Sequence, residues 1–256
     1  RQNAADGNTA IPVAGRCSPV RGKQWYQADA VAASYDATRF TGGGQIIDAR
    51  EKRAVLDALA PADGQSVLEI ACGTGRFTAA MAEAGATVTA FDISPAMMRR
   101  AEGRIDQAGH GGAVRFIRGD AARLPFETDS FDAVVAMRFF HLTDTPHRYL
   151  AEMARVSRDR VIFDTFNYRS ARRLYTWMLP MGSRLYGADE VQALVTGAGL
   201  EVVAAADDFV LPYGLYRQLS EPAARAVRRS VAPVRASPLG GRLASVTYWH
   251  TRCRGG

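Results

Sequence analysis

The chain has 256 residues, of which 47% are hydrophobic, and it carries a formal net charge of +6. This length and composition suit one large domain with a substantial core. The three cysteines, Cys17, Cys72 and Cys253, lie far apart, which argues against a disulfide framework or a metal motif and makes the cytoplasm the expected compartment. No apolar run has the length of a membrane span, and no signal-peptide core is present at the N-terminus.

The residues before the first strand pattern fall into two parts. Residues 1–24 are polar and show little periodicity, so we expect a mobile leader. From Trp25 onward apolar residues share one helical face, and a glycine-rich joint follows. Asp48, with Glu51 three residues later, predicts a capping box at the start of a second helix. We expect residues 25–65 to form a helical lid.

An apolar run, a turn of small residues and the start of a helix occupy residues 66–78. Val67 and Ile70 suit a buried parallel strand. Gly73 and Gly75 permit backbone angles that other residues resist, and they let a ligand approach the main chain next to the free amides of a helix N-terminus. A strand, a glycine turn and a helix together form the nucleotide-binding corner of a doubly wound α/β domain.

Strands and helices continue to alternate along the chain. Further helices are predicted from Arg76, after Ser94 as an N-cap, and from Pro146. Further strands are predicted at residues 87–91, 114–117, 131–137 and 160–164, each ending near a turn. This alternation requires a mostly parallel sheet with right-handed crossovers.

The pattern changes after residue 165. Helical stretches are expected around Leu174, Trp177 and Met178, and from Asp189 to Ala198. Strand patterns at 202–203, 209–211 and 244–249 predict an antiparallel hairpin, with a helical insertion at 213–240 between its strands. The sequence therefore predicts a Rossmann-like doubly wound α/β fold. Its sheet has seven strands, mostly parallel with an antiparallel C-terminal hairpin, and helices cover both faces.

The glycine turn carries a more specific signal. An acidic residue precedes it in the pattern Glu69-x-Ala71-x-Gly73-x-Gly75. This pattern resembles motif I of the class I S-adenosyl-L-methionine (SAM)-dependent methyltransferases, and Ala71 resembles a variant in ubiquinone/menaquinone C-methyltransferases. Thr78 occupies the place of the third glycine in a dinucleotide fingerprint, which disfavours NAD(P).

A second acidic residue, Asp92, ends the second strand seventeen residues after Gly75. A carboxylate there can accept hydrogen bonds from both ribose hydroxyls of a nucleotide, and an NAD enzyme would use the same residue. Residues 91–98 resemble motif II of small-molecule methyltransferases. The resemblance implies that Ile93 packs on adenine and that Met97 lines the same pocket, although core packing explains Met97 equally well.

A third anchor follows the third strand. Residues 119–132 read G-D-A-x-x-L-P-F-x-x-x-S-F-D, which resembles the ubiquinone-type methyltransferases. The resemblance implies that Asp120 binds the adenine amino group. The cofactor-binding residues expected from the three motifs and their surroundings are Tyr35, Arg39, Glu69, Ala71, Cys72, Gly73, Gly75, Asp92, Ile93, Met97, Asp120, Ala121 and Met137.

The remaining candidates lie around the expected sulfonium. In similar enzymes the N-terminal helix closes over SAM, so Arg39 can pair with the cofactor carboxylate beside Tyr35, or this helix packs without touching a ligand. His141 is a candidate catalytic base because imidazole titrates near neutrality. Its alternative role is packing of the next helix. Arg138 can hold an acidic substrate or pair with a carboxylate.

We therefore expect a SAM-dependent methyltransferase whose domain spans residues 66–256. It would methylate a small molecule by in-line displacement, with S-adenosyl-L-homocysteine (SAH) as product and no metal. The alternatives are an NAD(P)-dependent oxidoreductase, a nucleic-acid methyltransferase and a non-catalytic SAM-fold partner protein. The sequence leaves the acceptor and the oligomeric state open.

The positive charge is concentrated at the C-terminal end. Residues 213–256 hold eight basic residues and one acidic residue. Such a region can contact an anionic substrate, nucleic acid or a membrane surface, or form a solvated helix face. Nucleic acid is disfavoured because no N-P-P-Y-type tetrad follows the fourth strand, and peripheral membrane contact stays open.

Overall fold

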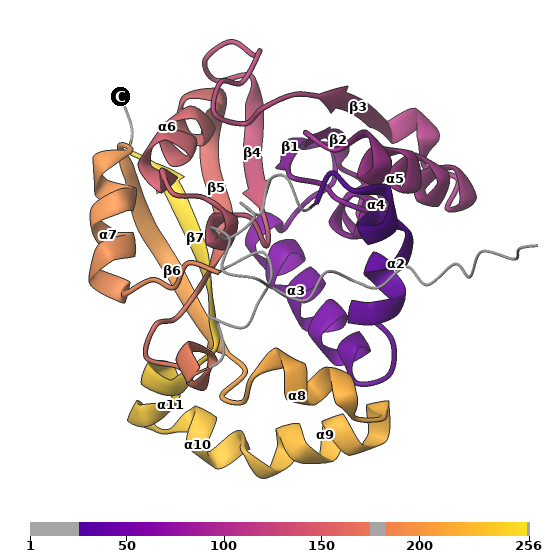
Figure 1. The fold of residues 1–256 in the computed structure, drawn as a ribbon. Coiled ribbons are helices and arrows are strands. Elements are labelled where there is room, and N and C mark those ends of the chain that lie inside the picture. Colours follow the sequence, from indigo (N-terminus) through magenta and orange to yellow (C-terminus); the bar gives the residue numbers. More distant parts are fainter. Residues whose placement is uncertain (1–25, 175–182, 255–256) are drawn as a thin grey trace, which may run out of the picture.

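The computed structural model describes residues 26–174 and 183–254 (Figure 1). They form a seven-stranded sheet with the order β3-β2-β1-β4-β5-β7-β6. The strands are β1 (Ser66–Ile70), β2 (Thr87–Asp92), β3 (Val114–Arg118), β4 (Phe131–Ala136), β5 (Ser157–Phe166), β6 (Leu200–Asp208) and β7 (Val246–Cys253). Strands β1 to β5 pair in parallel, and β7 runs antiparallel to both β5 and β6. This arrangement confirms the predicted fold class.

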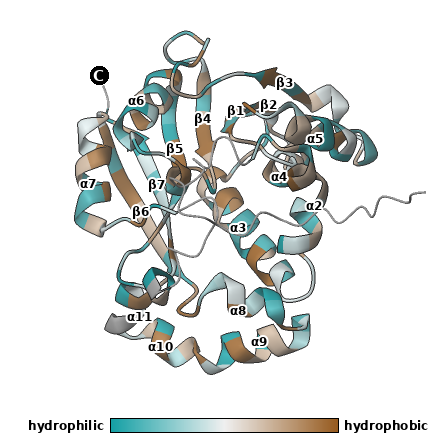
Figure 2. Cartoon of the chain, in the orientation of Figure 1, coloured by the Kyte–Doolittle hydropathy of each residue, from teal (hydrophilic) through white to brown (hydrophobic). Residues whose placement is uncertain are grey.

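Successive residues of a strand point to opposite faces of the sheet. Both faces of this sheet are apolar, and helices cover each of them. Val67 and Val135 join one hydrophobic cluster with α3 (Gly44–Leu59) and α4 (Arg76–Glu83). Their neighbours Leu68 and Val134 join a second cluster with α6 (Pro146–Val156) and α7 (Ala188–Gly197). In Figure 2, helix α7 shows both apolar and polar residues, in keeping with one buried and one solvent-facing side. The main helices before β6 are α2 (Asp29–Arg39), α3 (Gly44–Leu59), α4 (Arg76–Glu83), α5 (Pro95–Gln107), α6 (Pro146–Val156) and α7 (Ala188–Gly197).

Helix α3 corrects one prediction. It begins at Gly44, so Asp48 lies inside the helix and the predicted capping box is wrong. The chain before it is fixed by tertiary contacts. Gly43 donates a backbone hydrogen bond to the carbonyl of Leu219 at 2.8 Å, and a Cβ on Gly43 would lie 2.0 Å from the Tyr216 carbonyl oxygen. This close approach of the C-terminal helices sets where α3 starts.

Four helices occupy the connection between β6 and β7, where the sequence predicted a helical insertion. They are α8 (Tyr213–Gln218), α9 (Glu221–Ser230), α10 (Ala232–Ala236) and α11 (Pro238–Leu243), drawn at the lower edge of Figure 1. Phe209 was expected in a strand, but its φ of +57° ends β6 at Asp208. The Phe209 ring packs edge-on against Tyr213 and Tyr216, which anchors α8 below the sheet.

Some expectations fall outside the described residues. They concern the leader at 1–24 and the helical stretch around Trp177 and Met178. The division into a lid at 25–65 and a domain at 66–256 stays a prediction. Within the described residues, no helix is both long enough and apolar enough to cross a membrane.

Candidate functional site

The turn between β1 and α4 adopts the left-handed conformation that its small residues allow. Ala71, Gly73 and Gly75 have φ values of 56°, 56° and 74°. Glycine reaches this region without steric cost, whereas Ala71 is strained there. Gly75 has a second reason to lack a side chain, because a Cβ would lie 2.9 Å from the Cβ of Ala101 on α5. The turn therefore packs its backbone closely against α5.

Asp92 links this turn to the end of β2. One carboxylate oxygen accepts a hydrogen bond from the Gly73 backbone N–H and the other from the Ser94 N–H, both at 2.8 Å. Burial raises the pKa of Asp92, and the hydrogen bonds from the backbone oppose that shift. Ser94 also accepts a hydrogen bond from Met97 N and starts α5, as predicted. The Asp92 carboxylate is thus fixed in orientation before any ligand binds.

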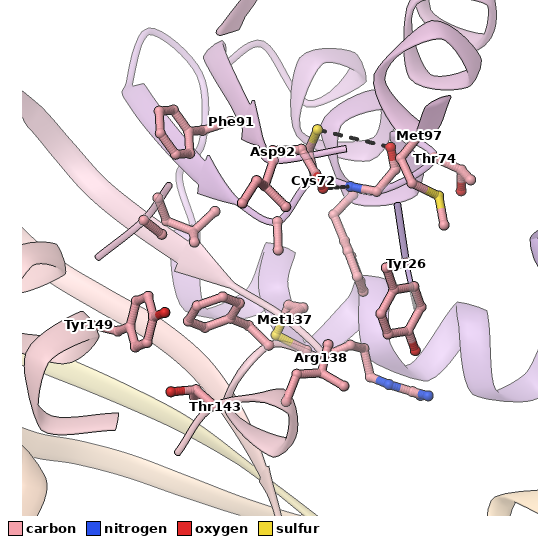
Figure 3. A pocket seen from close by; sticks show the side chains of 18 of the residues that line it. Tyr26, Cys72, Thr74, Phe91, Asp92, Met97, Met137, Arg138, Thr143 and Tyr149 are labelled. Carbon is pink, nitrogen blue, oxygen red and sulfur yellow. Dashed lines mark hydrogen bonds between the residues drawn. The ribbon is translucent and has the colours of Figure 1, made fainter. Parts of the chain in front are cut away.

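A cavity lies at the carboxyl ends of the strands (Figure 3). It encloses about 970 Å³, including the part open to solvent. Most of the predicted cofactor residues line it. They are Tyr35, Ala71, Cys72, Gly73, Asp92, Ile93, Met97, Asp120, Ala121 and Met137. Met97 also packs against Ala32 and Ala96 in a small cluster, so the pocket and core explanations for this residue both apply.

Asp120 reaches the cavity because its loop crosses closely over the end of β2. Gly119 donates a backbone hydrogen bond to the Asp92 carbonyl at 3.0 Å, and a Cβ on Gly119 would lie 2.4 Å from the Phe91 ring. Asp120 Oδ1 accepts a hydrogen bond from Ala122 N at 3.0 Å. The two acids predicted from motif II and from the 119–132 run therefore line one cavity.

Glu69 and Gly75 were predicted as cofactor residues but are not among the residues that line the cavity. Glu69 is buried below the turn, where the Thr78 hydroxyl donates a hydrogen bond to its carboxylate. Burial raises the pKa of Glu69 to about 8. Thr78, which replaces the third glycine of a dinucleotide fingerprint, is thus the direct partner of the motif I acid. Gly75 is the N-cap of α4.

Arg39 and His141 also lie outside the cavity lining. Arg39 ends α2, with its guanidinium carbon 4.7 Å from the centre of the Tyr35 ring. His141 lies in the short turn after β4, with its ring centre 4.9 Å from that of Phe166. Burial, reinforced by nearby arginines of which Arg138 has the largest effect, lowers the pKa of His141 well below its usual value. The imidazole is therefore neutral at physiological pH.

Arg138 pairs with a carboxylate, as one of its two predicted roles allowed, but sequence reasoning missed the buried network that this pair belongs to. Glu51 on α3 accepts from Arg138 Nη1 at 2.8 Å and from Arg76 Nη2 at 3.0 Å. Burial alone would raise the pKa of Glu51, but the two arginines lower it. The available signal was helical spacing. Glu51 lies four residues from Ile47 and from Val55, which are both buried, so it belongs to the inward face of α3.

The far end of the cavity is aromatic and basic. Phe139, Tyr149 and Tyr26 line it together with Arg138, whose side chain extends toward Tyr26 in Figure 3. Arg138 has a φ of +59°, and its backbone N–H donates to a carboxylate oxygen of Asp164 on β5. This contact holds the chain in a conformation that a residue with a Cβ seldom adopts.

Comparisons with known proteins agree with this geometry. Residues 67–160 match the family model described as "Methyltransferase domain". The demethylmenaquinone methyltransferase of Renibacterium salmoninarum is 38% identical over 131 residues, which cover 51% of this chain and 52% of that protein. The match thus spans about half the length of such curated relatives.

Two solved structures share the fold over most of the chain. The cyclase SpnF has a TM-score of 0.70 at 20% identity and covers 95% of this chain and 100% of its own. Magnesium protoporphyrin IX methyltransferase from Synechocystis PCC 6803, solved with bound SAH, has a TM-score of 0.65 at 14% identity, with coverage of 91% and 97%.

These solved structures share the fold of this chain, and residues 67–160 match a methyltransferase domain. Over about half of its length the chain is similar to demethylmenaquinone methyltransferases, and the matched domain contains the three predicted motifs.

Proposed function

We propose that the protein is a SAM-dependent methyltransferase that acts on a small molecule and releases SAH. The observation that supports this most directly is the placement of Asp92 and Asp120 in one cavity with the Gly73 turn. Asp92 suits the ribose of SAM, Asp120 suits the adenine, and the Gly73 turn suits the amino-acid portion. The methyltransferase-domain match and the demethylmenaquinone methyltransferase relatives support the same activity.

The residues present fit this cofactor. The Asp92 carboxylate, already held by two backbone N–H groups, has acceptor positions left for the ribose hydroxyls. Ile93 and Met97 offer apolar surface to the adenine, and Asp120 offers an acceptor for its amino group. We propose that Arg39, at the end of the helix that borders the cavity, pairs with the cofactor carboxylate, with Tyr35 packed beside it.

Bound SAM supplies an activated methyl group with a neutral thioether as the leaving group. The chain then has to align the acceptor with that group and exclude water, which in favourable cases is worth roughly 7–11 kcal/mol. Phe139 and Tyr149 on the cavity wall suit both tasks, because aromatic side chains keep the site apolar. A base is needed only where the acceptor has to lose a proton.

Calorimetry with SAM, SAH and NADH tests the cofactor, and transfer of labelled methyl from SAM to a metabolite extract tests the activity. We expect saturable binding of SAM and SAH, no binding of NADH, and label in a small-molecule product. Binding of NADH alone would favour the oxidoreductase. Binding of SAM with no labelled product from any extract would favour a non-catalytic partner protein.

We propose a small-molecule acceptor over nucleic acid. Part of the C-terminal basic charge is used within the fold, since Arg228 pairs with Asp208 and Arg225 with Glu221. Strongly salt-dependent binding to RNA or DNA would contradict this view. We also propose the cytoplasm as the compartment, in keeping with the free thiols of Cys72 and Cys253.

A further inference from the structure

Four arginines from separate parts of the chain lie near one another, and Arg138 is the one of them that lines the cavity. Arg39, Arg138, Arg172 and Arg217, here called the arginine cluster, come from the end of α2, the turn after β4, the segment after β5, and α8. The guanidinium carbons of Arg138 and Arg217 lie 5.2 and 5.8 Å from the centre of the Tyr213 ring. The cluster therefore forms only in the folded chain.

A second aromatic ring, that of Phe166, lies next to both Arg138 and Arg172. The guanidinium carbons of Arg138 and Arg172 lie 5.3 and 3.6 Å from the centre of the Phe166 ring. Tyr26 connects the cluster to the cavity. Burial raises the pKa of Tyr26 to about 12, while Arg39, Arg138 and Arg217 act in the opposite direction. Tyr26 and Arg138 both line the cavity.

The described acids beside Arg138 balance its charge only in part. Glu51 is shared between Arg138 and Arg76. Asp164 contacts the backbone N–H of Arg138, and burial raises the pKa of this carboxyl to about 7, so it carries only part of a negative charge at neutral pH. Among the described residues, these two acids therefore leave part of the positive charge around Arg138 and Arg217 unbalanced.

Arg217 shows the imbalance most clearly. Among the described residues it makes no hydrogen bond or ion pair, and its Nε and Nη2 are shielded from solvent without a partner. The Nε of Arg138 is likewise shielded from solvent without a hydrogen-bond partner. Burial, followed by the charges of Arg138 and Arg39, lowers the pKa of Arg217 to about 10. A buried cation without a partner is destabilising, and an anionic ligand would relieve that cost.

We propose that the methyl acceptor is a small molecule with an apolar body and one acidic group, a carboxylate or a phosphate, which Arg138 and Arg217 bind. The body would lie against Phe139 and Tyr149, and the acidic group would extend past Tyr26 toward Arg138 and Arg217. This inference rests on the proposed methyltransferase function and adds the chemical class of its substrate.

Binding of three matched probes tests the proposal by calorimetry, with and without saturating SAH. Benzoate represents the carboxylate, phenyl phosphate represents the phosphate, and benzamide is the neutral control. We expect benzoate or phenyl phosphate, whichever group the cluster fits, to bind at least tenfold more tightly than benzamide. Arg217→Gln should weaken the anion at least tenfold and leave SAH affinity unchanged, since a charge-assisted hydrogen bond is worth about 1.5–3 kcal/mol.

Arg229→Gln is the matched control, because Arg229 is exposed on α9 and its replacement removes the same charge. It should leave all affinities unchanged. Thermal unfolding gives a second readout, in which Arg217→Gln should raise the Tm of the ligand-free protein and Arg229→Gln should not.

Two results would overturn the anionic acceptor. One is benzamide binding as tightly as both anions. The other is an Arg217→Gln variant that loses SAH affinity instead of anion affinity, which would assign Arg217 to the cofactor carboxylate. Failure of the wild-type protein to bind SAH would reject the methyltransferase proposal, while the titrations without SAH would still decide the anion site.

Discussion

Two backbone N–H groups fix the carboxylate of Asp92 at the end of β2, beside the turn that follows β1. A side chain held in this way loses little further conformational freedom when a ligand binds, so its hydrogen bonds contribute more to affinity. The same two bonds come from Gly73 and Ser94, which are themselves fixed by the turn and by the start of α5. The cofactor proposal is therefore most sensitive to this one residue.

Asp92→Ala should weaken SAM binding tenfold or more, since a hydrogen bond to a charged group is worth about 1.5–3 kcal/mol. Isothermal titration measures the loss. Asp106→Ala, which removes an exposed acid on α5, is the control and should change nothing. Unchanged SAM affinity in a folded Asp92→Ala variant would contradict the assignment.

Glu69 should make stability depend on pH. Its pKa of about 8 in the fold lies above the value of 4.5 expected for an exposed glutamate. The folded state therefore holds a proton that the unfolded state releases, and stability from this group is lost as pH rises from about 4.5 to 8. Glu69→Gln keeps the neutral form at every pH. Its Tm should exceed that of the wild type at pH 9 and differ little at pH 5; an equal Tm at both pH values would show that Glu69 is charged in the fold.

His141 is neutral and lies outside the cavity lining. We expect His141→Ala to leave SAM affinity nearly intact and to reduce turnover by less than the roughly 100-fold typical of a lost base. Steady-state kinetics with the acceptor found in the metabolite screen measures this. A loss of 100-fold or more, with SAM affinity intact, would make His141 the base.

At the scale of elements, α3 connects the start of α4 to the basic end of the cavity through one buried acid. Glu51 joins Arg76 at the start of α4 to Arg138 after β4. Asp48, one turn earlier, pairs with Arg76 as well. These ion pairs cross between three elements, so they fix α3 against the strand ends that carry the site.

Glu51→Ala should destabilise the protein by about 3–5 kcal/mol, because it leaves two buried arginines without their shared partner. Arg53→Ala, on the exposed side of the same helix, breaks only the surface pair with Asp57 and should cost less than about 1 kcal/mol. Urea denaturation of both variants checks the contrast. Equal effects would show that the buried network is not a main support of α3.

At the scale of the whole molecule, the site lies where elements from distant parts of the chain meet. The cofactor end is built by loops after β1, β2 and β3, which lie side by side because parallel strands share one carboxyl edge. At the basic end of the cavity, α2 supplies Tyr35 to the lining, while α3 and α8 bring Glu51 and Tyr213 to Arg138. The four-helix connection between β6 and β7 therefore supports this end through α8, although it is far from the predicted motifs in the sequence.

The sequence by itself determined the parallel strands, the sheet class, the Ser94 cap and most of the residues that line the cavity. These features depend on short-range chemistry, such as apolar runs, a glycine turn and an acid at a strand end, which neighbouring residues specify. It did not place the start of α3, the inward face of Glu51 or the arginine cluster. Those were decided by tertiary structure, because the charge and backbone partners of each residue come from segments that only folding brings together.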